Sequence, residues 1–267
     1  MSLSILETFK LCKKENRPAL LTYTVAGDNN KKNSLEIIKS IAKYVDIIEL
    51  GIPHNTAVVD GSVIQDGAYR AINQKTKLKD VFDIARDFKK SKYAKPIILM
   101  GYYNLILQYG PKQFLKQCKK IGVDGLIVVD LPYPINIPFA KQCKSHRINF
   151  VQLIAPTTNN IRKKAILKAS HHMVYYISML STTGGKLKSK PKAVLNNYHA
   201  IKKLNPKKNI VIGFGINSKT IGNFKKNTDG LVVGSQIVKE ITTSLQKRQN
   251  PVTNITKLVK KLKEQIT

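Results

Sequence analysis

The chain alternates short runs of β-branched and other apolar residues with longer segments that carry apolar residues at helical spacing. The runs are Ala19–Val25, Val45–Leu50, Pro96–Met100, Gly125–Val129, Asn149–Ile154, Met173–Ser178, Asn209–Ile212 and Gly230–Val233. Near-continuous Val, Ile and Leu is typical of strands buried on both faces of a parallel sheet. Strands that alternate with helices predict parallel pairing through right-handed crossovers. Eight repeats in 267 residues favour an α/β fold that closes into a (β/α)8 TIM barrel over an open, doubly wound sheet.

The segments between these runs predict the helices of the barrel. Helices are expected at Ser34–Tyr44, Leu78–Phe88, Pro111–Ile121, Pro138–Lys144, Asn160–Ala169, Pro191–Leu204, Ser218–Lys225 and Gln236–Thr243. Two segments lie outside the repeat. Leu3–Lys14 predicts an extra N-terminal helix that plugs the bottom of the barrel, and Pro251–Gln265 predicts a closing C-terminal helix. No linker or change of composition interrupts the chain, so residues 1–267 are expected to form a single TIM-barrel domain.

The composition excludes several classes of protein. The net charge of +30 suggests nucleic-acid binding, but only six of the 46 basic residues are Arg, and the lysines are scattered over successive helices. We therefore expect solvated helix faces that attract an anionic substrate, and no specific nucleic-acid partner. No apolar run is long enough to span a membrane, and no secretory signal is evident.

Cysteine and histidine spacing argues against disulfide and metal sites. The three cysteines, Cys12, Cys118 and Cys143, are widely spaced and form no Cys-x-x-Cys motif. This usage fits a reducing cytoplasm and small apolar packing residues. The five histidines show no metal-ligand spacing, so no metal site is expected.

The strongest candidate for chemistry follows from where barrel enzymes carry their active sites, which is at the C-terminal ends of the strands. Glu49 lies near the end of the second run, and period two places Val45, Ile47 and Glu49 on one face. If that face points into the barrel, Glu49 is a carboxyl group in an apolar interior. Burial there raises its pKa, which suits a general acid/base. A structural glutamate bonded to backbone amides or to a lysine is the alternative.

Asp60 is the second candidate carboxylate, in the loop that follows Glu49. Asp60-Gly61 alone is more typical of a turn. Across the same loop from Glu49, however, it becomes a plausible catalytic partner.

Two glycine-containing loops indicate a phosphate site. Gly213-Phe214-Gly215 follows the seventh run, and Gly234-Ser235 follows the eighth and opens a helix. Backbone amides in such loops, with the positive end of a helix dipole, bind phosphate at this position in many barrels. The alternative is a pair of tight turns that need glycine for geometry alone.

At these residues the chain resembles the tryptophan synthase alpha chain family over essentially all of its length. The resemblance rests on Ile48-Glu49-Leu50-Gly51-Ile52-Pro53 with Asp60-Gly61, Tyr102-Tyr103-Asn104, Val129-Asp130-Leu131-Pro132, Leu153-Ile154-Ala155-Pro156-Thr157, Tyr175-Tyr176-Ile177-Ser178 with Thr183-Gly184, Gly213-Phe214-Gly215-Ile216 and Gly234-Ser235. The Glu-Leu-Gly-Ile-Pro stretch with the later Asp-Gly is the most specific part. The glycine loops alone would fit many phosphate-binding barrels.

The resemblance implies a lyase of tryptophan biosynthesis that cleaves indole-3-glycerol phosphate to indole and glyceraldehyde 3-phosphate. It implies Glu49 and Asp60 as catalytic residues. It further implies substrate binding by Tyr102, Leu153, Tyr175 and Thr183, and phosphate binding by Gly184, Gly213, Gly234 and Ser235. Indole would pass to a beta subunit that carries pyridoxal phosphate (PLP), within an α2β2 heterotetramer, so this chain would need no cofactor. Pro53 and Thr56 would lie at the partner interface.

The chain departs from the family pattern in its loops. An aromatic-Ser-Asp-Pro run usually follows Gly-Ile-Pro, whereas this chain reads His54-Asn55-Thr56-Ala57. The stretch Met179-Leu180-Ser181-Thr182 is also unusual. We therefore expect the chemistry to be kept and the communication with the partner to be altered. The alternatives are a catalytically weakened subunit that mainly activates the beta subunit, and another phosphate-sugar-binding barrel enzyme.

Overall fold

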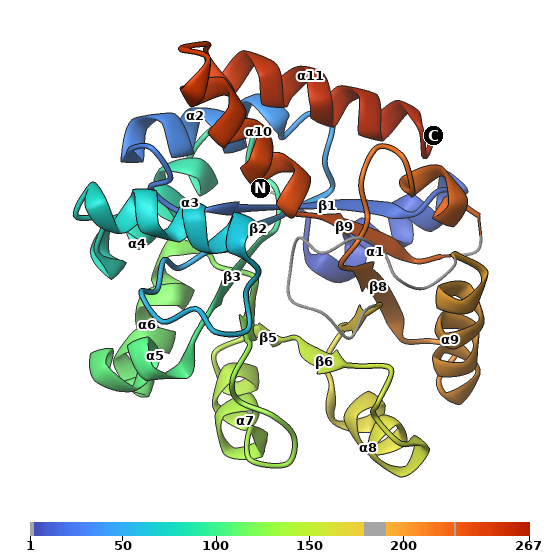
Figure 1. Cartoon of the computed structure of the whole chain (residues 1–267). Helices are drawn as coiled ribbons and strands as arrows, with labels where there is room; N and C mark the ends of the chain where they lie inside the picture. The colour runs from blue at the N-terminus through green and yellow to red at the C-terminus, as the bar shows by residue number, and fades with distance from the viewer. Residues whose placement is uncertain (1–2, 179–190, 227) are drawn as a thin grey trace.

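The strands of the chain form a nearly closed parallel barrel, which confirms the predicted fold class. The computed structural model describes residues 3–178, 191–226 and 228–267. Its strands are β1 (Ala19–Val25), β2 (Ile47–Gly51), β3 (Ile97–Gly101), β4 (Gly125–Val128), β5 (Asn149–Phe150), β6 (Gln152–Ile154), β7 (Met173–Ile177), β8 (Asn209–Gly213) and β9 (Gly230–Val233). Their hydrogen-bonded order is β5-β4-β3-β2-β1-β9-β8-β7-β6, and the strands form a ring at the centre of the molecule (Figure 1).

The fifth predicted strand is divided into two short pieces, β5 and β6. β5 pairs with β4 and β6 pairs with β7, and only Val151 separates them in the chain. The amide of Val151 still bonds to the carbonyl of Leu126 at 2.9 Å. One continuous segment therefore closes the ring, and the nine strands occupy the eight barrel positions that the sequence predicts.

The helices lie around the ring, and all but the first cover its outer face (Figure 1). They are α1 (Ile5–Lys14), α2 (Lys31–Ile41), α3 (Ser62–Asn73), α4 (Leu78–Lys89), α5 (Tyr103–Tyr109), α6 (Pro111–Ile121), α7 (Ile137–Ser145), α8 (Asn160–Ala169), α9 (Pro191–Leu204), α10 (Ser235–Gln246) and α11 (Pro251–Glu264). Most agree with the expected segments to within a few residues. None of the described helices is long and apolar enough to cross a membrane.

One expected helix was wrong and two were missed. Ser218–Lys225 contains only the short 3-10 helix η1 (Ile221–Phe224). The Thr220 hydroxyl bonds to the Gly215 carbonyl and receives a hydrogen bond from the Asn217 amide, so local side-chain contacts compete with helical pairing. Gly222 weakens a helix further. The missed helices, α3 and α5, follow the second and third strands, in segments where no helix is expected from the sequence.

The apolar core has two layers. The outer layer packs the helices against the outside of the strands, and the inner layer fills the barrel with residues such as Leu21, Ile47 and Val211. Ile5 and Phe9 of α1 join the inner layer. This confirms that the N-terminal helix plugs the bottom of the barrel. α11 packs against α2 and α10 as the predicted closing helix.

The three cysteines are buried in this core as free thiols. Burial raises the pKa of Cys12 to about 12 and that of Cys143 to about 12. Thiols in this state are poor nucleophiles, so the cysteines act as the small apolar packing residues that the sequence predicts.

Candidate active site

A pocket of about 430 Å³ opens at the C-terminal ends of the strands. Residues of five strands and of three of the loops that follow them line it: Tyr23, Glu49, Asp60, Ile64, Met100, Tyr175, Phe214, Gly215, Ile216, Val232, Gly234 and Ser235. The pocket therefore lies at the end of the barrel where the sequence analysis places the chemistry. It brings together both candidate carboxylates, Tyr175 and the Gly234-Ser235 loop.

Glu49 is fully buried in the middle of β2. Ile47, two residues earlier, belongs to the inner core, so Glu49 points into the barrel as predicted. Val45 differs from the prediction because it precedes β2 and packs in the outer core. Neither carboxyl oxygen of Glu49 has a hydrogen-bond partner among the described residues. Burial alone raises the pKa of Glu49 to about 8, so this carboxyl group carries a proton at neutral pH.

Two tyrosines flank Glu49 across the pocket. Tyr23 is the direct neighbour of Glu49 in the β1–β2 register. Burial raises the pKa of Tyr23 and of Tyr175 well above the ordinary value, and the nearby Glu49 and Asp60 carboxylates add to this. Both phenols are therefore neutral and supply hydrogen-bond donors without charge.

Glycines make room for these two rings. A Cβ atom on Gly51 would collide with the hydroxyl of Tyr23, and one on Gly213 would collide with the hydroxyl of Tyr175. Each tyrosine thus extends over the last residue of a neighbouring strand. Glycine at positions 51 and 213 is required by this packing, whether or not a ligand approaches the backbone.

Asp60 is held at the edge of the pocket by Tyr102. The Tyr102 hydroxyl donates to Asp60 Oδ2 at 3.1 Å and accepts from the amide of Val59 at 3.2 Å. Gln65 of α3 donates to the carbonyls of Ala57 and Asp60 at 3.0 and 2.8 Å. The loop thus has a fixed shape although Asp60 is only partly buried. The resemblance implies Tyr102 as a substrate-binding residue, whereas its hydrogen bond to the second carboxylate does not follow from the sequence.

The predicted phosphate residues divide into three groups. Gly234 and Ser235 line the pocket, and Ser235 begins α10. Gly213 ends β8 beneath Tyr175, whereas Gly215, with a φ of +70°, is the glycine of that loop that lines the pocket. Gly184 and the substrate residue Thr183 fall in 179–190, outside the described residues.

Leu153 and the predicted partner-contact residues do not line this pocket. Leu153 packs against the inner core and lines a neighbouring pocket of about 560 Å³ between the barrel and α8. Pro53 is partly buried and Thr56 is exposed, in a turn where the amide of Thr56 donates to His54 Nδ1 at 2.9 Å. Val58 in the same turn is 72% exposed, so this rim presents apolar surface.

The pocket also contains residues that the sequence analysis did not select. Tyr23, Met100 and Ile64 are examples, together with Phe214 and Ile216 beside the phosphate glycines. Tyr23 and Met100 carried a usable signal, because period two within β1 and β3 turns them inward. Across the described part of the chain, no group of His, Cys, Asp and Glu could hold a metal ion.

Comparisons with known proteins all point to one family. A family model described as tryptophan synthase alpha chain matches residues 9–267. A tryptophan synthase alpha chain from Pelagibacter ubique is 64% identical over 259 residues, which cover 97% of each protein. The crystal structure of tryptophan synthase subunit alpha from Legionella pneumophila is 28% identical, with a TM-score of 0.90 and 97% of both chains covered. A chain in the structure of the tryptophan synthase α2β2 complex from Pyrococcus furiosus is 32% identical, with a TM-score of 0.82 and coverage of 92% of this chain and 98% of that chain. This chain therefore belongs to the tryptophan synthase alpha chain family.

Proposed function

We propose that this chain cleaves indole-3-glycerol phosphate in the pocket around Glu49, with Glu49 and Asp60 as the catalytic residues. The lyase reaction itself is that of the family, which acts in tryptophan biosynthesis and releases indole and glyceraldehyde 3-phosphate. The observation that carries the residue assignment is the buried and unpartnered carboxyl group of Glu49, which shares a pocket with a second carboxylate and a helix N-terminus.

Glu49 serves as the general acid and base. The reaction breaks the bond between the indole ring carbon and the glycerol chain. Protonated Glu49 donates its proton to that ring carbon, and the carboxylate then accepts the proton of the neighbouring glycerol hydroxyl as the aldehyde forms. The raised pKa of about 8 keeps the starting proton in place at neutral pH.

Asp60 acts on the ring nitrogen. Protonation of the ring carbon puts positive charge on the indole N–H, which an ionised carboxylate stabilises. Tyr102 is a positioning residue in this scheme, since its hydroxyl donates to Asp60 Oδ2 and fixes the carboxylate. The role of Thr183 in substrate binding stays a prediction.

The rest of the substrate occupies the remaining pocket surfaces. Backbone amides at Gly215, Gly234 and Ser235 bind the phosphate, because the N-terminus of α10 offers unpaired amides and the positive end of its dipole. Gly184 is expected to join them. Gly213 contributes through the room that it leaves for Tyr175. Tyr175 forms a wall against the indole ring, and substrate contacts of Tyr102 at the pocket edge and of Leu153 in the neighbouring pocket stay predictions.

We propose an α2β2 assembly with a beta subunit. The Pyrococcus furiosus relative is found in such a complex, and the rim formed by Pro53, Thr56 and Val58 offers a partly apolar contact surface. The family reaction needs no cofactor in this chain, and PLP belongs to the beta subunit. One barrel domain over residues 1–267 and a cytoplasmic location stay predictions.

The direct test is indole release from indole-3-glycerol phosphate, with and without the cognate beta subunit. We expect turnover in both conditions and faster turnover in the complex. Absence of turnover in both would contradict the proposal.

A weakened alpha subunit that mainly activates its partner is the second candidate. The exposed Thr56, which stands in the turn where the family usually has an acid, favours it. This candidate predicts that the chain stimulates the beta reaction while the complex releases no indole from indole-3-glycerol phosphate. Thr56→Asp, which restores the acid, separates the two candidates. Only a chain with intact chemistry and altered communication should release indole before the substitution and stimulate the beta reaction more strongly after it.

A further inference from the structure

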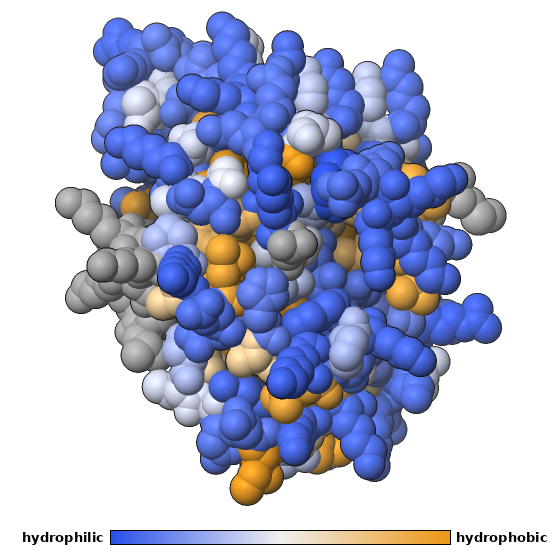
Figure 2. Space-filling model, turned by 90° about the vertical axis from the view of Figure 1, so that its right-hand side faces the viewer, coloured by the Kyte–Doolittle hydropathy of each residue, from blue (hydrophilic) through white to orange (hydrophobic). Residues whose placement is uncertain are grey.

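A second, cationic cleft lies at the opposite end of the barrel from the active site. Its volume is about 1650 Å³, and it is bounded by α1, by α9, by the segments that lead into β8 and β9, and by the residues after α11. Its basic residues are Lys13, Arg17, His199, Lys202, Lys225 and Lys226, and Asp229 is its one acidic side chain among the described residues. The face that carries α9 and the C-terminus is dominated by hydrophilic residues (Figure 2).

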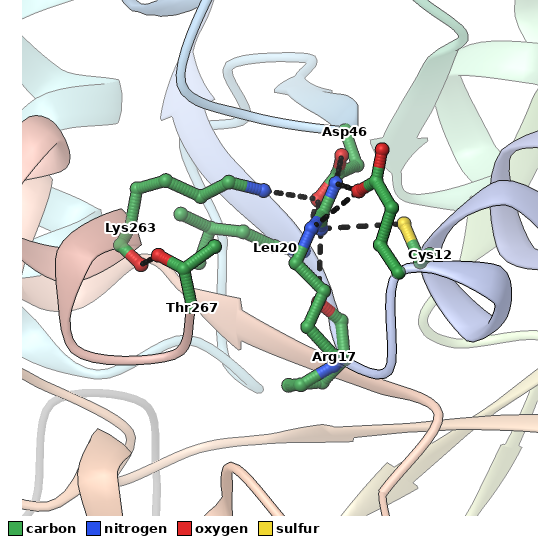
Figure 3. A network of polar contacts seen from close by, with 8 residues as sticks. Cys12, Arg17, Leu20, Asp46, Lys263 and Thr267 are labelled. Carbon is green, nitrogen blue, oxygen red and sulfur yellow. Dashed lines mark hydrogen bonds and ion pairs between the residues drawn. The ribbon is translucent and has the colours of Figure 1, made fainter.

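Two of these cations, Arg17 and Lys202, are held in place because each already pairs with a carboxylate. Figure 3 shows the Arg17 guanidinium directed at Asp46, with Cys12 and the Leu20 backbone nearby. The Arg17–Asp46 contacts measure 2.7 and 2.9 Å. Lys202 Nζ donates to Asp229 at 2.7 Å and to the Lys208 carbonyl at 2.8 Å. These two side chains have little conformational freedom to lose when a ligand binds.

The other lysines of the cleft carry uncompensated charge. Lys13, Lys225 and Lys226 are exposed, and none of them forms an ion pair with a described carboxylate. They come from two distant parts of the sequence, α1 and the segment after η1, yet they line one cleft. The electrostatic potentials of lysines that line one cleft add up and attract an anion placed between them.

We propose that this cleft binds an oligophosphate, an anion with several linked phosphate groups. Three uncompensated ammonium groups match a ligand of three or more negative charges better than a monophosphate. Lysine suits such a ligand because it contacts phosphate as a point charge and needs no fixed bidentate geometry. The site is independent of the active-site pocket, since the two share no lining residue.

Calorimetric titration with inorganic tripolyphosphate at about 150 mM salt tests the proposal. The test variant carries Lys13→Gln, Lys225→Gln and Lys226→Gln. The control variant carries Lys112→Gln, Lys116→Gln and Lys119→Gln, which removes the same charge from the exposed face of α6. We expect the cleft variant to bind tripolyphosphate about tenfold more weakly than the wild type, and the control variant to bind it nearly as the wild type does.

Three results of the tripolyphosphate titrations would overturn the proposal. These are no binding to the wild type, an equal loss of affinity in both variants, and displacement of tripolyphosphate by glyceraldehyde 3-phosphate, which would assign the binding to the active-site pocket. Tighter binding of duplex DNA than of tripolyphosphate, abolished in the cleft variant, would also contradict it. Indole release by the cleft variant should equal that of the wild type, so failure of this proposal and failure of the proposed function are distinguishable.

Discussion

Two carboxylates only three positions apart in the chain, Asp46 and Glu49, face opposite ends of the barrel and are both buried, but they differ in the partners that set their charge. Asp46 directly precedes β2, at its N-terminal end, and accepts hydrogen bonds from Arg17, Lys263 and the Leu20 amide. Burial opposes its ionisation, but these partners outweigh burial and lower the pKa of Asp46 below its ordinary value. Glu49 is more deeply buried and has no described hydrogen-bond partner, and its pKa rises to about 8.

Neighbouring positions of the chain thus serve stability and chemistry separately. A buried charge with several donors ties elements together, and here Asp46 joins β1 and β2 to α11 and to the segment that follows α1. A buried carboxyl without donors keeps its proton and remains available to a substrate. The following predictions test this division of roles.

The largest expected effect is on catalysis by Glu49→Gln. Glutamine fills the same volume but cannot transfer the proton, so indole release should fall about a thousandfold. Single-turnover kinetics with the purified chain measure it. Glu36→Gln, at an exposed carboxylate of α2, is the control and should leave the rate unchanged. An active Glu49→Gln enzyme would remove Glu49 from the chemistry.

Asp46→Asn should instead affect stability. The substitution leaves the buried Arg17 guanidinium without its main counter-charge, which costs about 3–5 kcal/mol of unfolding free energy. Urea denaturation measures it. Asp87→Asn breaks an exposed ion pair with Arg86 and should cost less than about 0.5 kcal/mol. Equal losses in the two variants would show that the Asp46 network contributes no more than a surface pair.

Glu49 should make the wild type less stable as the pH rises. Its pKa is raised in the folded state, so between the ordinary value of 4.5 and about 8 the folded chain binds more protons than the unfolded chain. Stability is therefore lost through that window as pH increases. The unfolding free energy of Glu49→Gln minus that of the wild type should grow by about 2 kcal/mol from about pH 5 to pH 7. A difference that stays constant would mean that Glu49 is ionised in the native state.

Tyr102→Phe should give the smallest effect. Loss of the hydroxyl removes the 3.1 Å bond to Asp60, and the rate of indole release should fall about tenfold. Tyr109→Phe, at a partly exposed ring of α5, is the matched control. Asp60→Asn should already remove the contribution of the Tyr102–Asp60 bond to the rate. Tyr102→Phe should therefore lower the rate of indole release little further in the double variant. Full additivity of the two losses would contradict a positioning role.

The sequence predicts the barrel well because its strand signal is strong. Runs such as Ala19–Val25 and Gly230–Val233 match the observed strands to the residue. The helix α3 was missed because its buried face consists of Ile64, Gly67, Ala68 and Ala71, which give little apolar contrast. Gly67 lies close to Val238 and to Asp28, so tertiary packing decides the element.

The positions of the two carboxylates could be predicted from the sequence, whereas the contacts of the site residues could not. The position of Glu49 follows from strand period and barrel polarity. The absence of a partner does not, since it depends on which side chains the other strands bring to the interior. The same limit applies to Gly213 and Gly215, because only the packing of Tyr175 shows which glycine faces the pocket.

An NMR titration shows directly whether the buried Glu49 carboxyl group holds a proton at neutral pH. The carboxyl carbons of glutamate can be labelled with ¹³C, and the Glu49 resonance identified by its loss in Glu49→Gln. Its chemical shift is then followed from about pH 4 to pH 9, around the ordinary glutamate pKa. We expect Glu49 to titrate with a pKa of about 8 in the free protein. Titration at or below the ordinary glutamate value of 4.5 would contradict it.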